Sequence, residues 1–199
     1  PLLSHDEKLK DGVGHIVTAS RLSKDKTPQI DSVEEAVRAL SELYPDIKWQ
    51  IDVCGDGPLR DYFDRRYRML SRELKNVSHV MHGWVLPQDV PQMMNNAFLT
   101  VTAGMAGMRA LASGSLCLGT GARATVGIQT GKNLRAGIWS NFGDHGVFRF
   151  TPTSVSGDLK ELASSSAYDR AVSVARAVIK QSNSQNIVNG MMLSALQCE

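Results

Sequence analysis

The sequence has little excess charge and no long hydrophobic run. Across 199 residues, 22 lysines and arginines stand against 20 aspartates and glutamates, which gives a formal net charge of +2. A charge this small gives no reason to expect a nucleic acid or an acidic membrane surface as a partner. The longest apolar stretch is only as long as a strand, well below the roughly 18 residues of a membrane span, and no signal peptide opens the chain. We therefore expect a cytoplasmic protein without a membrane span.

Cysteine and paired metal ligands are also scarce. The three cysteines are Cys54, Cys117 and Cys198, an odd number without CxxC spacing, which fits a reducing compartment better than a disulfide framework. There is no DxD motif. The histidines are scattered without paired ligand spacing: His5, His15, His79, His82 and His145. The sequence therefore predicts no metal site, and we assign no histidine a catalytic role.

The composition is that of an ordinary globular domain. Hydrophobic residues form 42% of the chain, and the 17 glycines complete the usual apolar share. At about 150 residues per domain, this length predicts one large domain over residues 1–199. Within it we expect a polar lead-in at 1–13, a body of strands and helices at 14–150, and a helical tail at 151–199.

The body alternates between strand and helix patterns. Five short apolar runs predict strands, at His15–Ser20, Trp49–Cys54, Val77–Met81, Phe98–Thr102 and Leu116–Gly119. Between them, apolar spacing and turn signals predict helices at Asp31–Tyr44, Leu59–Leu74, Pro87–Asn96 and Met108–Ala112. Parallel neighbours need a crossover, and helices supply it. We therefore expect an α/β fold with a Rossmann-like parallel sheet and helices on both faces, with the first strand central and strands three and four on opposite sides of it.

The periodicity fails between Ala122 and Asp144. A last strand is expected at Gly146–Phe150, followed by tail helices at Gly157–Ala163, Tyr168–Gln181 and Asn186–Leu196. Within the irregular segment, three residues suggest either a substrate flap or a packed loop, and we favour the loop: Trp139, Phe142 and His145.

The informative residues follow the strands, because ligands of such sheets bind outside the carboxyl ends of the strands. Glycine or a cation appears after every predicted strand, in Ser20–Lys26, Gly55–Pro58, Gly83–Val85, Ala103–Gly107 and Thr120–Gly121. Glycine permits close backbone approach to a ligand, and a helix N-terminus favours a phosphate. The alternative is that these glycines merely end strands, as in any α/β protein.

One segment carries charge of a single sign. Between Val90 and Gly143 there is no carboxylate, whereas four cations fall inside: Arg109, Arg123, Lys132 and Arg135. With Arg21 and Lys26 on the same rim, they would suit a diphosphate, because guanidinium and ammonium groups make strong charge-assisted bonds. A solvated basic rim without a ligand is the alternative.

A family resemblance rests on these same segments. SRLSKDK at Ser20–Lys26 resembles the G-R-L-x-x-x-K signature of retaining glycosyltransferases with the GT-B fold, the glycogen-synthase-like superfamily. CGDGPLRDYF at Cys54–Phe63 is similar to its G-x-G-P turn, and VSHVMHGWV at Val77–Val85 to its V-x-F-x-G-x-V segment. PQDVPQMMNNAFLTV and ALASGSLCLGTG resemble the segments that follow in that family, so the likeness spans roughly residues 14–121 in the family's order.

The resemblance implies the nucleotide-sugar-binding C-terminal half of a transferase whose N-terminal acceptor domain is absent from this chain. Arg21 and Lys26 would then be the catalytic cations that hold the donor diphosphate, stabilising the charge that develops as it departs, with no metal or other cofactor. The backbone at Trp84 and Val85 would meet the nucleobase, although Trp84 is equally interpretable as a core or lid residue. The other substrate-binding positions implied are Ser20, Gly55, Gly57, Gly83, Gly104, Met105, Ala106, Gly107, Met108 and Arg109.

The sequence departs from that family where a donor-binding glutamate is expected, because Arg109 stands there and an earlier glutamate has no counterpart. A carboxylate accepts hydrogen bonds from ribose hydroxyls, whereas arginine can only donate. Three hypotheses follow: the donor-binding half of a glycosyltransferase, an inactive transferase-like subunit that stabilises or steers an active partner subunit, and a sugar-nucleotide epimerase of the same fold.

Overall fold

The computed structural model, which describes residues 1–147 and 149–183, is built around one six-stranded sheet of order β3-β2-β1-β4-β5-β6. The strands are β1 (Val13–Ala19), β2 (Lys48–Cys54), β3 (Val77–Gly83), β4 (Leu99–Thr102), β5 (Leu116–Thr120) and β6 (Thr125–Ile128). The first five pair in parallel, with β3 and β4 on opposite sides of β1. The predicted fold class and strand arrangement are confirmed.

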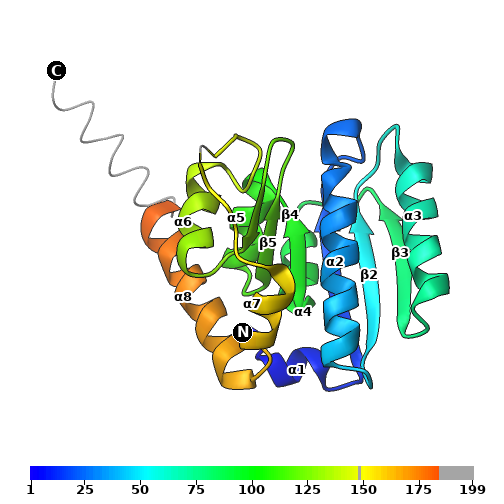
Figure 1. Ribbon diagram of the computed structural model, residues 1–199, viewed down its shortest axis with the longest axis horizontal. Helices are drawn as coiled ribbons and strands as arrows, with labels where there is room; N and C mark the ends of the chain where they lie inside the picture. Colours follow the sequence, from blue (N-terminus) through cyan, green and yellow to red (C-terminus); the bar gives the residue numbers. More distant parts are fainter. Residues whose placement is uncertain (148, 184–199) are drawn as a thin grey trace, which may run out of the picture.

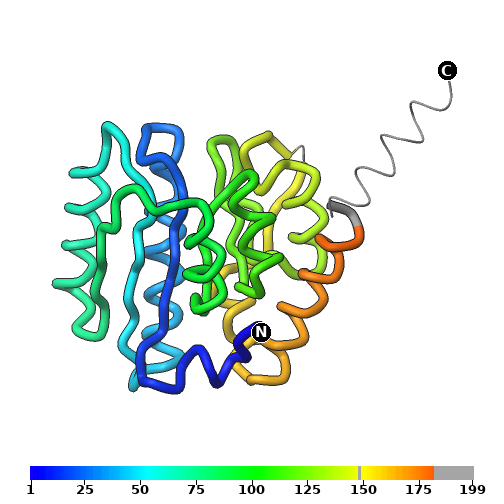
Figure 2. The backbone as a smooth tube through the Cα atoms, turned by 180° about the vertical axis from the view of Figure 1, so that it is seen from behind, coloured from blue at the N-terminus to red at the C-terminus, as the bar shows by residue number. Residues whose placement is uncertain are grey.

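Helices cover both faces of the sheet, as predicted. They are α1 (His5–Leu9), α2 (Pro28–Leu43), α3 (Arg60–Glu73), α4 (Val90–Asn96), α5 (Gly104–Ala112), α6 (Gly131–Trp139), α7 (Val155–Glu161) and α8 (Ser165–Asn183). The helices α2, α3 and α7 lie in front of the sheet in Figure 1. The view from behind shows α4 and α5, coloured green, on the opposite side (Figure 2).

Alternate residues of the strands supply two hydrophobic cores. Ile16 of β1 and Ile51 of β2 pack with Val37 of α2 in the larger core, whereas the neighbouring Val17 packs with Leu111 of α5 in the other. Successive strand residues point to opposite faces, and a parallel sheet has both faces covered. The continuous apolar runs of the sequence are the consequence.

The predicted irregular segment contains two regular elements, β6 and α6, so that interpretation was wrong. Only a short turn separates β5 from β6, and the Gly121 amide donates to the carbonyl of Ala124 at 3.0 Å. A turn this short joins only antiparallel strands, and β6 indeed runs antiparallel to β5. Both elements have weak sequence signals. The strand β6 has only four residues, too few to show a clear hydrophobic period, and Gly131 and Gly137 weaken the helical pattern of α6.

Other boundaries also differ from the expectation. The described residues of Gly146–Phe150, all except residue 148, form no strand. The lead-in contains α1, whose sequence is short and polar. The helix α5 begins at Gly104, so the expected glycine turn is its first turn, and the glycines there lowered the helical signal. The helix predicted at 186–196 lies outside the described residues, and α7 and α8 form the helical tail as far as it is described.

No helix within residues 1–147 and 149–183 combines the length and the apolar character needed to cross a bilayer.

Candidate functional site

A pocket of about 410 Å³ lies at the carboxyl ends of β1 and β2, between the segment after β3 and the helix α5. Seven of its lining residues were singled out from the sequence: Ser20, Arg21, Gly55, Trp84, Val85, Ala106 and Arg109. Five others were missed: Ala19, Cys54, Asp56, Pro87 and Val90. Ala19, Cys54 and Asp56 directly adjoin predicted positions, so the ends of the strands were the signal that would have found them.

Two loops close the floor of the pocket by packing on each other. The Ser20 amide donates to the Cys54 carbonyl at 3.1 Å, and the Leu22 amide donates to the Asp56 carbonyl at 3.0 Å. A Cβ at Gly55, whose φ is +151°, would overlap the Ser20 carbonyl oxygen, and a Cβ at Gly57 would lie 2.5 Å from the Leu22 oxygen. The loop contact therefore accounts for both glycines, and only Gly55 also lines the pocket.

The wall after β3 carries an exposed indole. β3 ends at Gly83, which has a φ of +68° and whose carbonyl accepts from the Gly55 amide at 2.7 Å. The next residue, Trp84, is 76% exposed, whereas Val85 is partly buried against the smaller core. Trp84 is therefore a rim residue, and its ring offers a flat apolar face to a ligand.

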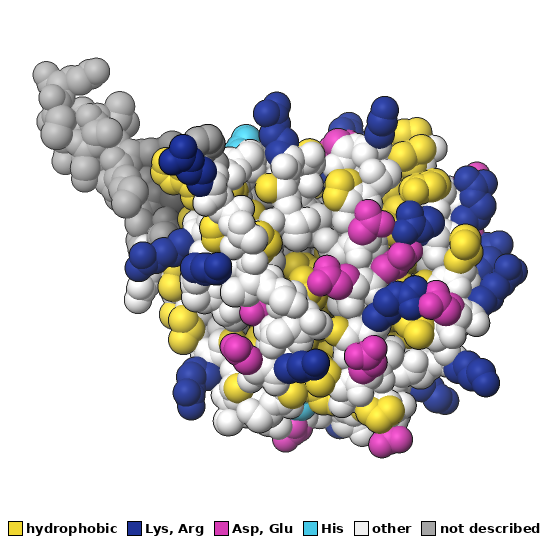
Figure 3. Space-filling view, viewed as in Figure 1, with side chains coloured by type: hydrophobic (Ala, Val, Ile, Leu, Met, Phe, Trp, Pro, Cys, Tyr) yellow, Lys and Arg dark blue, Asp and Glu magenta, His cyan; other side chains and the backbone are white. Residues whose placement is uncertain are grey.

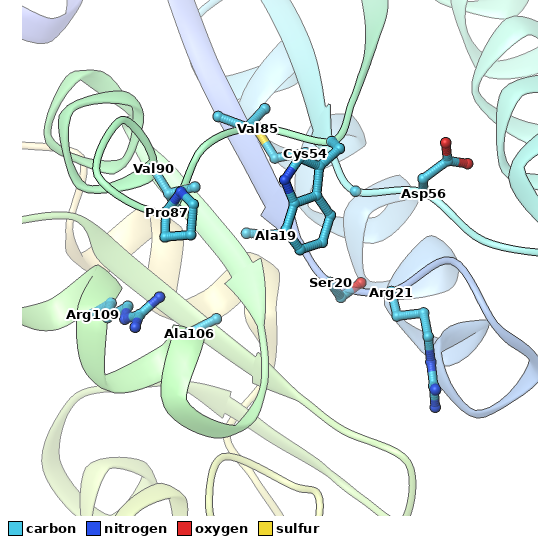
Figure 4. A pocket seen from close by; sticks show the side chains of 12 residues that line it. Ala19, Ser20, Arg21, Cys54, Asp56, Val85, Pro87, Val90, Ala106 and Arg109 are labelled. Atoms are coloured by element: carbon cyan, nitrogen blue, oxygen red, sulfur yellow. The ribbon is translucent and has the colours of Figure 1, made fainter.

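Two guanidinium groups stand on opposite sides of the pocket. Arg21 follows β1 and Arg109 lies on α5, with Ala106 between them in Figure 4. Both are exposed. The side chain of Arg21 donates only to the Ser23 hydroxyl, at 3.4 Å, and Arg109 has no hydrogen bond or ion pair within the described part of the chain. Their charges are available to an anion.

Lys26 was predicted to hold a diphosphate together with Arg21, but it does not line the pocket. Its ammonium lies 2.5 Å from Oδ1 of Asp144 and 3.7 Å from Oδ2 of Asp25. The side chain is only 16% exposed. The structure therefore places Lys26 in an internal ion pair.

The residues of α5 divide between the pocket and the packing of the helix. Gly104 has a φ of +62° and donates its amide to the Asn141 carbonyl at 2.9 Å. A Cβ at Gly107 would lie 2.5 Å from the buried ring of Phe142. Met105 is 62% exposed, and Met108 is partly buried. Gly104, Met105, Gly107 and Met108 do not line the pocket.

The packed-loop interpretation holds for one of its three residues. Phe142 is 1% exposed, but Trp139, the last residue of α6, is 83% exposed, and His145 is also exposed. The remaining cations do not converge on the pocket: Lys132 donates to the Thr151 carbonyl, and neither Arg123 nor Arg135 lines the cavity.

The thiol in the pocket is not poised to act as a nucleophile. Burial raises the pKa of Cys54 to about 12, and the nearby Asp52 carboxylate adds to the effect. Within residues 1–147 and 149–183, no group of three His, Cys, Asp or Glu side chains is placed to hold a metal ion. Apart from the Asp56 carboxylate, which lies 4.0 Å from the Arg60 guanidinium, the pocket offers cationic and hydrogen-bond donor groups beside an apolar wall, which suits an anionic ligand with an aromatic portion.

No protein-family model and no curated protein matches the chain. Solved structures do. One is Staphylococcus aureus TarM in complex with UDP, with 15% identity over 92% of this chain and a TM-score of 0.60. Another is Anabaena HepE in complex with UDP and glucose, with 18% identity over 98% of this chain and a TM-score of 0.59.

The chain covers 35% of the TarM chain and 51% of the HepE chain. A third structure is of similar size, the C-terminal domain of a group 1 glycosyltransferase, LpcC, from Francisella tularensis. It has 16% identity and a TM-score of 0.57, with coverage of 92% of this chain and 94% of that domain. The chain therefore has the Rossmann-like fold of the C-terminal domain of a GT-B glycosyltransferase.

Proposed function

We propose that this chain binds a nucleotide-diphosphate sugar and forms the donor-binding half of a glycosyltransferase. The observation that carries the proposal is the pocket at the carboxyl ends of β1 and β2, where neither Arg21 nor Arg109 forms an ion pair among the described residues. Rossmann-like sheets bind their ligands at this edge. The solved TarM and HepE structures of similar fold hold UDP.

The chemistry of the pocket suits the parts of such a donor. Arg21 and Arg109 would hold the diphosphate, and the exposed ring of Trp84 would stack on the nucleobase. Negative charge grows on the departing nucleoside diphosphate as the glycosidic bond breaks. Fixed cations stabilise that charge, which lowers the barrier without a metal.

Retention of configuration belongs to the proposal through the motif resemblance alone. The anomeric configuration of the product, read by NMR, tests it separately from donor binding, because an inverted product would contradict retention and leave donor binding intact.

The acceptor site is proposed to lie in a second domain. The chain spans about a third to a half of the TarM and HepE chains. A closed reaction site excludes water, and one open edge of a sheet does not. We also propose a cytoplasmic location, in keeping with the free, buried thiols of Cys54 and Cys117.

Isothermal titration of the 199-residue chain with UDP, GDP and ADP tests the proposal. We expect saturable binding of at least one of the three, weakened by added salt because the cations on the rim are exposed. Absence of binding by all three at millimolar concentration would contradict donor binding.

A second candidate is an inactive transferase-like subunit that stabilises or steers an active partner. Two observations favour it: Arg109 stands where the resemblance expects a glutamate, and Lys26 is already paired with Asp144. Failure to bind any nucleotide would favour this candidate if the chain also shows a cooperative thermal unfolding transition, which would prove that it is folded.

A further inference from the structure

One residue of the pocket carries the opposite charge to its two arginines. Asp56 follows β2, and it is the one carboxylate among the described residues that line the pocket. Its side chain is 57% exposed. Figure 4 shows Asp56 and Arg21 on the same side of the pocket, with their charged ends pointing in different directions. Arg21 therefore leaves this carboxylate available to a ligand.

The contacts of Asp56 with its own segment use a single carboxylate oxygen. Oδ1 accepts from the Gly57 amide at 2.8 Å and lies 4.0 Å from Nη1 of Arg60. Ion pairs between partly exposed groups at this separation contribute little. Oδ2 forms no hydrogen bond or ion pair within the part of the chain that the structure describes. A carboxylate oxygen accepts hydrogen bonds and repels a phosphate, so Oδ2 suits a ligand group that donates, such as a hydroxyl.

Backbone hydrogen bonds hold Asp56 between the loops that follow the two neighbouring strands. The Leu22 amide, in the loop after β1, donates to the Asp56 carbonyl at 3.0 Å. The Gly55 amide donates to the carbonyl of Gly83, the last residue of β3, at 2.7 Å. The position of Asp56 is therefore fixed relative to both loops.

The order of the strands places four pocket residues in a row along the carboxyl edge of the sheet. Neighbouring strands follow the order β3-β2-β1-β4, and after them come Trp84, Asp56, Arg21 and, on α5, Arg109. A nucleoside diphosphate carries its base, its ribose and its two phosphates in a matching order. With the base on Trp84 and the phosphates on the two arginines, the ribose lies beside Asp56.

We propose that Asp56 recognises the ribose of the donor, with its carboxylate accepting a hydrogen bond from the 2′- or the 3′-hydroxyl group. The inference rests on the proposed function. A site built to bond a hydroxyl group rejects an analogue without it, because its own polar group then loses water and gains no partner. The pocket should therefore prefer ribonucleotides to nucleotides that lack these hydroxyl groups.

Titration calorimetry with UDP, GDP and ADP, and with the 2′,3′-dideoxy form of each, tests the inference. For a nucleotide that binds, the ratio of the two dissociation constants measures what the hydroxyl groups contribute. We expect the parent to bind the ribonucleotide about tenfold more tightly than its dideoxy form, and Asp56→Ala to bind both equally. Loss of the bond to the Gly57 amide affects both ligands alike, so it cancels in the ratio.

Asp61→Ala is the matched control, because Asp61 is exposed in the first turn of α3, lies outside the pocket and carries the same charge. It should keep the tenfold preference. Loss of the preference in this control as well would mean that net charge alone causes the effect, which overturns the inference.

The hydroxyl groups of the transferred sugar present the same chemistry as those of the ribose, so a further titration uses the glucose-bearing form of the nucleotide that binds. If Asp56→Ala weakens binding of this form alone and keeps the preference over the dideoxy form, the carboxylate contacts the sugar. That result would overturn the assignment to the ribose.

The outcomes separate this inference from the proposed function. If the parent binds a nucleotide and its dideoxy form equally well, or Asp56→Ala keeps the preference of the parent, the inference is wrong while donor binding stands. If none of the three nucleotides binds, both are wrong. Thermal unfolding checks the fold of each variant, and Asp56→Asn, which keeps an acceptor for the Gly57 amide, repeats the test if Asp56→Ala does not fold.

Discussion

At the scale of single residues, Arg21 and Arg109 carry the proposed function. Replacing either by alanine should weaken UDP binding about ten- to a hundredfold, because a hydrogen bond to a charged group is worth roughly 1.5–3 kcal/mol. Arg135→Ala is the control, since Arg135 is exposed and lies outside the pocket. Titration calorimetry measures all three, and parent-like affinity in both pocket variants would shift the assignment toward the inactive subunit.

Asp52 is a second residue whose surroundings predict a measurable behaviour. Its carboxylate is 3% exposed and bonds to Nδ1 of His15 and Nε2 of His82, both at 2.7 Å, and to the Gln50 amide at 2.8 Å. Burial raises the pKa of Asp52, but the hydrogen bonds from His15, His82 and Gln50 lower it by more. The pKa of Asp52 is therefore below its usual value.

A carboxyl group whose pKa is lower in the folded state stabilises the fold at pH values above its unfolded-state pKa. It loses that contribution as the pH falls through its folded-state pKa. The free energy of unfolding should therefore decrease as the pH falls below about 4. Urea titrations at several pH values should show a shallower acid loss for Asp52→Asn than for the parent. Asp46→Asn, at an exposed site, should follow the parent, and equal slopes in all three chains would refute the role of Asp52.

At the scale of elements, the short helix α1 is held by one buried ammonium. Lys8 is 4% exposed and donates to the carbonyls of Asn95, Ala97 and Gly114 at 2.7, 2.7 and 3.0 Å. Lys8→Met leaves these carbonyls without that donor and should lower the free energy of unfolding by about 3 kcal/mol, as read by urea titration. Lys10→Met, at an exposed neighbour, should change it by less than about 0.5 kcal/mol, and similar losses in both variants would contradict this anchor.

The contact between the loops after β1 and β2 is a second element with a sharp requirement. Gly55→Ala places a methyl group on the Ser20 carbonyl and should cost at least about 2 kcal/mol of stability. Gly146→Ala, where a Cβ meets open space, provides the matched control. Thermal denaturation distinguishes them, and an unchanged melting temperature for Gly55→Ala would show that the loops can separate at little cost.

In the molecule as a whole, the surface formed by α2 and α3 differs in charge and polarity from the surface at the carboxyl ends of the strands. On the face of α2 and α3, charges of both signs are interspersed in Figure 3, and ion pairs such as Arg38–Glu73 and Arg66–Glu34 join the two helices. Near the carboxyl edge of the strands, by contrast, Trp84 and Met105 are largely exposed. Trp84 lines the pocket, and Met105 is the neighbour in α5 of the lining residue Ala106, so both exposed apolar side chains lie next to the proposed donor site.

The chain by itself should therefore bind a donor but transfer no sugar. Release of UDP from a UDP-sugar, followed with and without acceptor, should stay at the rate measured without protein. A mixture of UDP-sugar and acceptor turned over by residues 1–199 alone would refute the split-site proposal.

The first five strands, the helices between them, and the strand edge where the pocket lies followed from the sequence alone. Hydrophobic periodicity is local, so His15–Ser20 or Trp49–Cys54 could be read as strands without knowledge of their neighbours. Parallel strands place their carboxyl ends together, and this brought Arg21, Trp84 and Arg109 to one pocket. The antiparallel β6 was lost because a short edge strand with a glycine carries little periodic signal.

Which cations are available and which are already paired depends on how distant segments pack. Lys26 and Asp144 are 118 residues apart, and their contact depends on where α5, the β5–β6 turn and the loop of Phe142 pack. The glycines at 55 and 57 looked like ligand-facing positions, but their cause is a contact between two loops that no local pattern encodes. Side-chain pairing across the fold arises from packing over long sequence separations, which is why composition and spacing could name the cations but not which of them remain available.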